Sequence, residues 1–359
     1  MVTLGVCVNP GTVNERRIRR WVLSRVAPYN QGMLKRIILL GGLLVVAATS
    51  VRAADLIADV KAANAQQRFK DGEALVSEAR RTGETPVTLE AWSWLGRGAL
   101  AAQQYDAADR YAREAEARVL AWLKTHPLDA EEHVPLALGA AFEVQAQVLA
   151  AQHERSAGVS LLQKALQRYG RSSIQARLQK NLNLLSLAGQ PLPSLGGRGT
   201  RFGAPMPNRT GKVTLVFLWA HWCSDCKSQG PIIAELEAAY RSRGLVVVGL
   251  TGHYGYVKGG APATPDVETK YIDDVRREYY GSINMAVPVD DQAVKAFGVS
   301  TTPTIVIADR QGRVAAYHPG KMTRAELDAV ILPLLDQPAT PTASGPSPRP
   351  GRSTRPTGN

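Results

Sequence analysis

Cysteine is scarce in this chain, with only three among 359 residues. Cys7 stands near the start, and Cys223 and Cys226 form a pair separated by two residues. A structural zinc site needs four ligands, and a domain held together by disulfides needs several bridges. Apart from Cys7, the chain has only this one pair of cysteines. The sequence therefore excludes a disulfide scaffold and argues against structural zinc. It leaves dithiol chemistry at the pair.

Excess charge is nearly absent from the middle of the chain, although the formal net charge is +12. Residues 1–53 carry eight Lys and Arg against one Glu, and residues 336–359 carry three Arg against one Asp, which leaves +3 for residues 54–335. A nucleic-acid surface requires basic side chains clustered on a folded domain. The high isoelectric point therefore reports the two ends, and we expect no nucleic-acid partner.

The motifs that bind common cofactors are also missing. The sequence contains no phosphate-binding loop, no HExxH metalloprotease motif and no glycine-rich dinucleotide fingerprint. Electrons for redox chemistry must therefore arrive by thiol exchange. We expect a redox-active Cys223–Cys226 disulfide, with no other cofactor and no metal.

No apolar run near the N-terminus reaches the roughly 20 residues of a membrane span. A basic start at Met33 precedes the short apolar run Ile37–Ala48 and small residues that end at Ala53. This pattern predicts a signal peptide over residues 33–53 within a leader of residues 1–53. We expect a periplasmic or otherwise extracytoplasmic protein. An uncleaved membrane anchor is the alternative, and either Met1 or Met33 is the start.

Residues 54–188 read as helical throughout. They are rich in Ala, Leu, Gln, Arg and Glu, and their apolar residues recur at spacings of three and four. One stretch has the spacing of a tetratricopeptide repeat, in which small residues let two helices approach closely: Trp92, Leu95, Gly96, Tyr105 and Ala108. The region is expected to be a tetratricopeptide-like domain that docks a partner. A plain helical bundle is the alternative.

The cysteine pair lies where a strand passes into a helix. Val213–Trp219 is a continuous apolar run typical of a buried strand, and a helix is expected from the cysteines to about Tyr240. The helix N-terminus favours a thiolate at Cys223, which is expected to be the exposed nucleophile. Cys226, one turn deeper, is expected to be the resolving thiol.

The stretch from Trp219 to Lys227, with Pro231 and the Thr302-Pro303-Thr304 step, resembles the thioredoxin superfamily and its TlpA-like extracytoplasmic branch. The resemblance covers about Gly189–Leu335. It implies a second domain over residues 189–335 with an α/β thioredoxin fold, a central mixed sheet flanked by helices. The expected fold is thus an all-α helical-repeat-like N-terminal module followed by a thioredoxin fold.

The resemblance also implies an activity. It implies a protein-disulfide reductase that takes electrons from a membrane thiol relay and serves cytochrome c maturation or protein repair. Two alternatives remain: a disulfide-forming oxidase, and a helical-repeat interaction protein whose thioredoxin fold is redox-impaired. In the family, the proline matching Pro303 is cis and faces the cysteines, and Thr302 beside it pairs with an extended substrate. Trp222 is expected to pack around the motif.

Two positions depart from the family pattern. Phe217 stands where thioredoxins carry a buried acid, and Gln229 stands where TlpA-like proteins often carry Glu. Asp225 or bulk water is left as proton acceptor for the resolving thiol. The Asp225 charge is also expected to raise the pKa of Cys223 and make the pair more reducing. His221 and His253 suggest copper, but copper-binding relatives space their cysteines by three residues.

The rest of the second half predicts ordinary thioredoxin elements and one insertion. Residues 251–280 are longer than a minimal thioredoxin requires and are expected to form a substrate-facing lid. Asp309–Gly312 indicates a tight hairpin between two strands. Residues 336–359 are proline-rich without apolar periodicity, and this tail is expected to be disordered.

Overall fold

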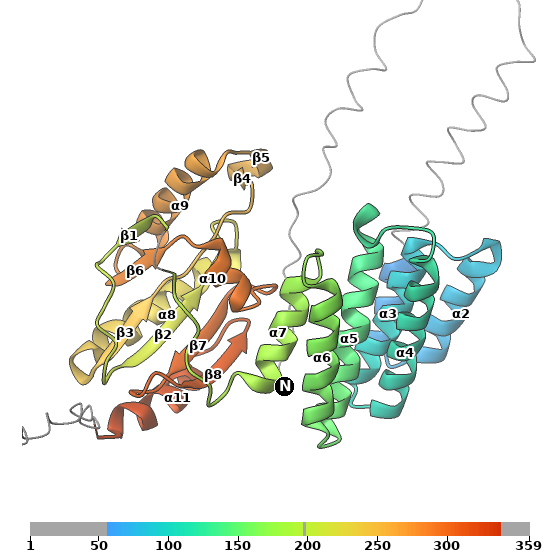
Figure 1. The fold of residues 1–359 in the computed structure, drawn as a ribbon, viewed down its shortest axis with the longest axis horizontal. Helices are drawn as coiled ribbons and strands as arrows, with labels where there is room; N and C mark the ends of the chain where they lie inside the picture. Colours follow the sequence, from blue (N-terminus) through green and yellow to red (C-terminus); the bar gives the residue numbers. More distant parts are fainter. Residues whose placement is uncertain (1–55, 197–198, 339–359) are drawn as a thin grey trace, which may run out of the picture.

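The computed structural model describes residues 56–196 and 199–338. A helical domain over residues 56–186 is followed by an α/β domain, and the two lie side by side (Figure 1). The predicted signal peptide at residues 33–53, Cys7 and nearly all of the predicted disordered tail lie outside the described residues.

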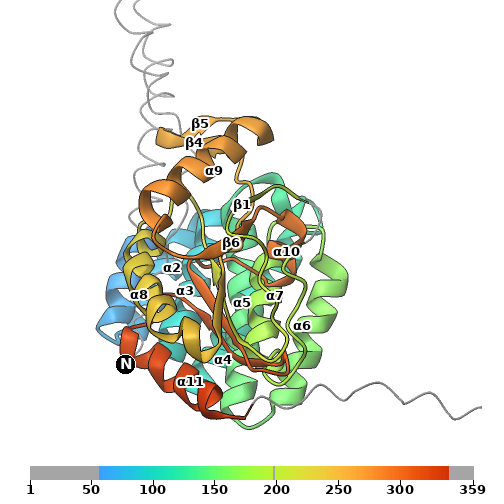
Figure 2. The same cartoon turned by 90° about the vertical axis from the view of Figure 1, so that its left-hand side faces the viewer.

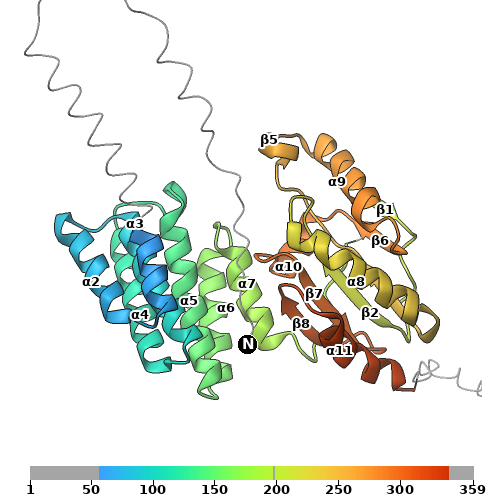
Figure 3. The same cartoon turned by 180° about the vertical axis from the view of Figure 1, so that it is seen from behind.

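The helices of the first domain stack against one another in chain order (Figures 1 and 3). The elements are a helix over residues 56–65, α2 (Phe69–Ala79), the 3₁₀ turn η2 (Arg80–Thr82), α3 (Pro86–Ala101), α4 (Tyr105–Trp122), η3 (Leu128–Ala130), α5 (His133–Ala151), α6 (Arg155–Tyr169) and α7 (Gln175–Ser186).

Small residues bring α3 and α4 close together. Gly96 faces the Ala108 carbonyl and the Ala112 amide, where an added Cβ would already be in van der Waals contact. The Trp92 and Tyr111 rings meet edge to face, with centroids 5.7 Å apart. The predicted spacing therefore does pack two helices. Membership of the tetratricopeptide class stays a prediction.

Helix α5 is the central helix of this domain. It contacts α3, α4, α6 and α7. By length and composition it could cross a membrane, but most of it is buried among its neighbours. Helix α5 is therefore the core helix of the stack.

The second domain is built on a six-stranded mixed sheet in the order β1-β6-β3-β2-β7-β8. Its elements are β1 (Arg201–Gly203), β2 (Val213–Leu218), α8 (Ser224–Tyr240), η4 (Arg241–Arg243), β3 (Leu245–Val248), β4 (Tyr256–Val257), η5 (Lys258–Gly260), β5 (Ala261–Pro262), α9 (Pro265–Tyr280), β6 (Met285–Pro288), α10 (Asp291–Ala296), β7 (Thr304–Ala308), β8 (Val314–Pro319) and α11 (Arg324–Asp336).

Strand β2 is central to the sheet and is buried along its whole length. It runs parallel to β3 and antiparallel to β7. Leu215 and Phe217 join a core with residues of α8, α9 and α11, whereas Val216 and Leu218 join a second core on the other face. Because both faces are covered, the strand reads as a continuous apolar run rather than an alternating one.

The predicted insertion forms a two-stranded ribbon, β4–β5, followed by α9. Figure 2 shows these elements together at one edge of the domain. Helix α9 contacts both α8 and β4. The predicted hairpin between β7 and β8 is confirmed, with its turn at Asp309–Gly312.

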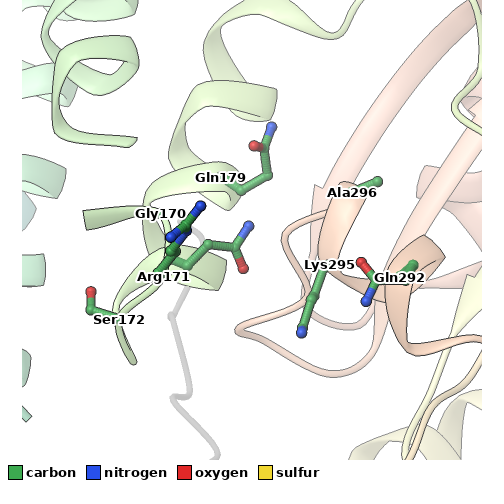
Figure 4. A pocket seen from close by; sticks show the side chains of 8 residues that line it. Gly170, Arg171, Ser172, Gln179, Gln292, Lys295 and Ala296 are labelled. Carbon is green, nitrogen blue, oxygen red and sulfur yellow. The ribbon is translucent and has the colours of Figure 1, made fainter. Parts of the chain in front are cut away.

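The two domains meet where α7 packs against α10 and β8. The Asn183 side chain donates to the Ala296 carbonyl over 3.3 Å. Beside this contact lies a hollow of about 460 Å³, shown in Figure 4. Its lining comes from both domains: Gly170, Arg171, Ser172, Gln175, Gln179, Gln292, Lys295 and Ala296.

Gly298 generates a test of this domain contact. Its φ is +63°, and an added Cβ would lie 2.6 Å from the Gln179 carbonyl carbon and clash with the Lys180 amide. We predict that Gly298→Ala separates the domains, measured as faster proteolysis across residues 187–196 and a lower unfolding midpoint.

Gly312→Ala is the matched control, because its φ is +76° with nothing within 4 Å of the added atom. That variant should lose only the ~1–2 kcal/mol that a left-handed backbone costs an L-residue. Equal behaviour of the two variants would mean that the α7 contact does not hold the domains together.

Candidate active site

Cys223 caps the N-terminus of α8. Its sulfur accepts a hydrogen bond from the Cys226 backbone N–H, with Sγ and N 3.1 Å apart. Both cysteines are free thiols. Strand β2 and the short loop after it thus place the first sulfur at the positive end of a helix and the second one turn inside it.

The prediction that Cys223 is exposed is wrong. Its side chain is 1 % exposed, and that of Cys226 is fully buried. Both belong to the apolar core, and Trp222 and the inserted Tyr254 pack against that core. The helix start is therefore covered, and Tyr254 of the predicted insertion at residues 251–280 contributes to the cover.

The two thiols have opposite acidities. The pKa of Cys223 is lowered to about 7, first by its hydrogen bond with the Cys226 thiol and then by those with Thr302 and the Cys226 amide. Burial and the Asp225 charge oppose this shift. The pKa of Cys226 is raised well above its usual value, first by burial, then by its hydrogen bond with Cys223 and by the negative charge of Cys223. Cys223 is therefore the thiolate near neutral pH.

The segment before β7 closes the site from the other side. The Thr302–Pro303 bond is cis, as the resemblance implied. The Cys223 thiol donates to the Thr302 carbonyl, with sulfur and oxygen 3.4 Å apart. The structure thus brings together Cys223, Cys226 and Thr302, although 79 residues separate Cys223 from Thr302.

Comparison with known proteins agrees with this geometry. Residues 208–333 match the family model described as a thioredoxin-like domain. The C-terminal domain is thioredoxin-like. The matched stretch is about a third of the chain, and the helical domain lies outside it.

The similar curated proteins match about a third of this chain. The thiol-disulfide oxidoreductase ResA of Bacillus thuringiensis subsp. konkukian is 23 % identical over 121 residues, which cover 34 % of this chain and 62 % of the relative. ResA of Geobacillus thermodenitrificans is 24 % identical, over 38 % of this chain and 68 % of the relative. The chain thus spans about three fifths of the first relative's length.

Two solved structures have low overall similarity to this chain. A putative thiol:disulfide interchange protein DsbE from Chlorobium tepidum is 24 % identical and covers 41 % of this chain and 97 % of its own, with a TM-score of 0.31. The thioredoxin-like superfamily protein SPOA0173 is 22 % identical over 43 % of this chain and all of its own, with a TM-score of 0.33.

Both departures from the family pattern have a structural explanation. Phe217 and Tyr280 pack edge to face with ring centroids 5.5 Å apart, so aromatic packing fills the position of the thioredoxin acid. Gln229 is fully buried and pairs with the backbone of Met322, donating over 3.0 Å and accepting over 2.9 Å. Its amide thus joins α8 to the segment after β8. An acid could not donate at neutral pH.

Asp225 lies between the cysteines in sequence and forms an ion pair with Lys321 over 3.1 Å. Its charge raises the pKa of Cys223, the direction expected from the sequence, although four stronger effects precede it. Lys321 partly offsets that charge. Asp225 is therefore a modulator of Cys223.

The site also contains a buried His–Glu pair that the sequence did not predict. His221 Nε2 and Glu268 Oε1 lie 2.9 Å apart, and each side chain is 1 % exposed. Burial lowers the pKa of His221 below its usual value, against the pull of Glu268. No local pattern could have revealed the pair, because Glu268 lies 47 residues away on the inserted α9.

Glu268 also accepts two backbone hydrogen bonds from the inserted loop. The Tyr254 amide donates to Oε1 over 2.6 Å, and the Gly255 amide donates to Oε2 over 2.8 Å. The rings of Tyr254 and Trp222 then meet edge to face at 5.5 Å. Glu268 thus fixes the loop beside the cysteines, so the predicted lid is tied to the active-site loop.

Asp225 and Lys321 provide two charge tests of opposite sign. We predict that Asp225→Asn lowers the pKa of Cys223 and makes the reduction potential less negative. Lys321→Gln should raise that pKa, because Asp225 loses its countercharge. The potential should move by no more than about 30 mV, the shift for a tenfold change in equilibrium constant.

Thiolate absorbance at 240 nm as a function of pH measures these pKa changes. Shifts of the same sign in both variants, or no resolved shift in either, would contradict a role for this ion pair.

Glu268→Gln tests the connection to the inserted loop. A glutamine keeps one carbonyl oxygen but turns an N–H donor toward the backbone N–H of either Gly255 or Tyr254, so one of these two backbone hydrogen bonds must fail. We predict faster amide hydrogen exchange at residues 252–256. Asp266→Asn, on an exposed position of the same helix, is the control and should exchange like the unaltered protein. Equal exchange in all three proteins would rule out the connection.

Proposed function

We propose that this protein is an exported thiol–disulfide oxidoreductase that reduces disulfides in protein substrates. The observation that carries the proposal is the opposite acidity of two adjacent thiols, one lowered to about 7 and one raised, at the start of one helix. The more acidic thiol, Cys223, attacks the substrate disulfide as a thiolate, and Cys226 stays protonated until the second step.

In the first step the Cys223 thiolate attacks one sulfur of the substrate disulfide. A bond forms between Cys223 and that sulfur, the substrate S–S bond breaks, and the second substrate sulfur leaves as a thiolate. The Thr302 carbonyl, 3.4 Å from Cys223, lies on the side where an extended substrate chain would run. Trp222 Nε1, which has no hydrogen-bond partner among the described residues, is a donor that such a chain could use.

In the second step Cys226 attacks Cys223 and releases the substrate as a dithiol. The bond and the charge of Cys223 are two of the three effects that raise the pKa of Cys226. Both end once Cys223 is bound in a mixed disulfide, so Cys226 becomes more acidic at the step that needs its thiolate. Its proton passes to the departing substrate thiolate. Two electrons move from the protein to the substrate, leaving a Cys223–Cys226 disulfide.

Reduction is favoured over oxidation by the acidity of Cys223. A thiol with a pKa of about 7 matches reducing thioredoxins, whereas a strong oxidase has a far more acidic thiol, of pKa about 3.5, that stabilises its reduced form. Regeneration requires an external dithiol, which we assign to a membrane thiol relay. No other cofactor enters the cycle.

The remaining assignments come from the sequence. The basic start and apolar run within residues 33–53 support export, and the helical domain supports docking of a partner protein. An interaction protein with an impaired redox site is the second candidate. It is favoured by one observation: Phe217 and Gln229 leave no carboxylate at the two family positions.

Mixed-disulfide trapping tests the redox proposal. We predict that Cys226→Ser, incubated with an oxidised protein substrate such as insulin, accumulates a covalent adduct on Cys223 that dithiothreitol releases. Without the resolving thiol the second step cannot occur. Cys223→Ser is the matched control, and it should form no adduct and reduce no insulin.

Adducts on Cys226 in the control, or no adduct with either variant, would contradict the assigned roles. Turnover by the unaltered protein decides between an enzyme and an impaired interaction protein. Its measured reduction potential decides between a reductase and an oxidase.

A further inference from the structure

Cationic side chains gather around Trp94 on the helical domain, far from the cysteines in sequence. The Lys61 ammonium and the Arg97 guanidinium each lie 3.9 Å from the centre of a Trp94 ring. Arg177 of α7 is near enough to Arg97 for their charges to repel. These residues come from the helix over residues 56–65 and from α3 and α7, both of which contact α5. They form what we call the Trp94 cluster.

Arg97 is the unusual member of this cluster. Its side chain is half-buried, yet it forms no ion pair or hydrogen bond with the residues that the structure describes. Burial, and then repulsion by Arg177, lowers its pKa to about 10. A cation withdrawn from water without an ion-pair or hydrogen-bond partner costs free energy, even when it stacks on an aromatic ring.

The nearby carboxylates are already paired. Glu143 accepts from Arg177 over 2.8 Å and from Lys180 over 3.1 Å. Glu90 lies 2.6 Å from His133 Nδ1 and accepts from Trp94 Nε1 over 3.1 Å. Neither is hydrogen-bonded to Arg97, although the charge of each raises the pKa of Arg97, against burial and Arg177. The cluster therefore has positive charge that its own acids do not neutralise at close range.

We propose that the Trp94 cluster binds a carboxylate of an acidic peptide segment in a partner protein, with Arg97 as the principal contact. A planar guanidinium can hold a carboxylate through two parallel hydrogen bonds, and an incoming anion relieves its repulsion with Arg177. The exposed Lys61 adds a second cation at the open edge.

The occupant must come from another protein. The two terminal segments of this chain, residues 1–53 and 336–359, are both net basic, so the cluster would repel them. In a second copy of this chain, the neighbouring acids Asp273 and Asp274 of α9 are already paired with Arg276 and Arg277, so this acidic run is a poor ligand. This inference goes beyond the redox chemistry and does not depend on it.

Binding of a defined probe to the full chain tests the proposal. The probe is a fluorescent dodecapeptide of alternating Glu and Ala, blocked at both ends, and its control has Gln in place of Glu. We expect the Glu peptide alone to raise the anisotropy, at about 50 mM salt where screening is weak. Arg97→Met should weaken that binding about tenfold or more, as expected for loss of a charged hydrogen bond.

Arg81→Met is the matched control. Arg81 is 76 % exposed and, within the part of the chain that the structure describes, pairs only with the neighbouring Glu78, so the variant removes the same charge elsewhere on the domain. Its affinity should stay within about twofold of the unaltered protein, because exposed charges act weakly over distance. Arg97→Met should also unfold at the same or a higher temperature, since it removes a half-buried cation that has no ion-pair partner among the described residues and leaves an apolar side chain against Trp94.

Three results would overturn the proposal. In the first, the Gln peptide binds as well as the Glu peptide, or neither peptide binds. In the second, the two variants weaken binding equally, which would mean that only net charge matters. In the third, Arg97→Met unfolds at a clearly lower temperature, which would make Arg97 a structural residue. Light scattering excludes self-association as the source of the signal.

Discussion

The chemistry of this protein depends on the hydrogen bonds to one sulfur atom. Cys223 caps α8, so its sulfur accepts hydrogen bonds from the Cys226 amide and the Cys226 thiol, and as a thiol it donates to the Thr302 carbonyl. That arrangement needs a buried central strand to deliver the helix start and β7 to deliver Thr302. Because β2 lies next to β7 in the sheet, the start of α8 after β2 and Thr302 before β7 both lie beside the Cys223 sulfur.

Local sequence patterns predicted the parts of the fold that local physics determines. The apolar run at Val213–Leu218 is a buried strand because it is covered on both faces. The turn at Asp309–Gly312 and the helix that starts at Ser224 also follow from short-range preferences. The cis bond before Pro303 followed from resemblance to a family.

Long-range pairs decided what the sequence could not reveal. Cys223 is buried rather than exposed, within a core against which the inserted Tyr254 packs, and Glu268 holds that insertion through His221 and two backbone amides. The sequence also did not predict that Lys321 forms an ion pair with Asp225. Each of these contacts joins residues distant in sequence, whereas periodicity and spacing report only neighbours within a few positions.

The asymmetry of the two thiols can be measured directly on the unaltered, reduced protein. The rate of iodoacetamide alkylation is followed against pH, and mass spectrometry of the peptides assigns each label to its cysteine. The structure requires a labelling midpoint of about pH 7 at Cys223 and little labelling at Cys226 over the same range. A midpoint near the ordinary cysteine value of about 8.5 at Cys223, or preferential labelling of Cys226, would contradict the assignment of nucleophile and resolving thiol.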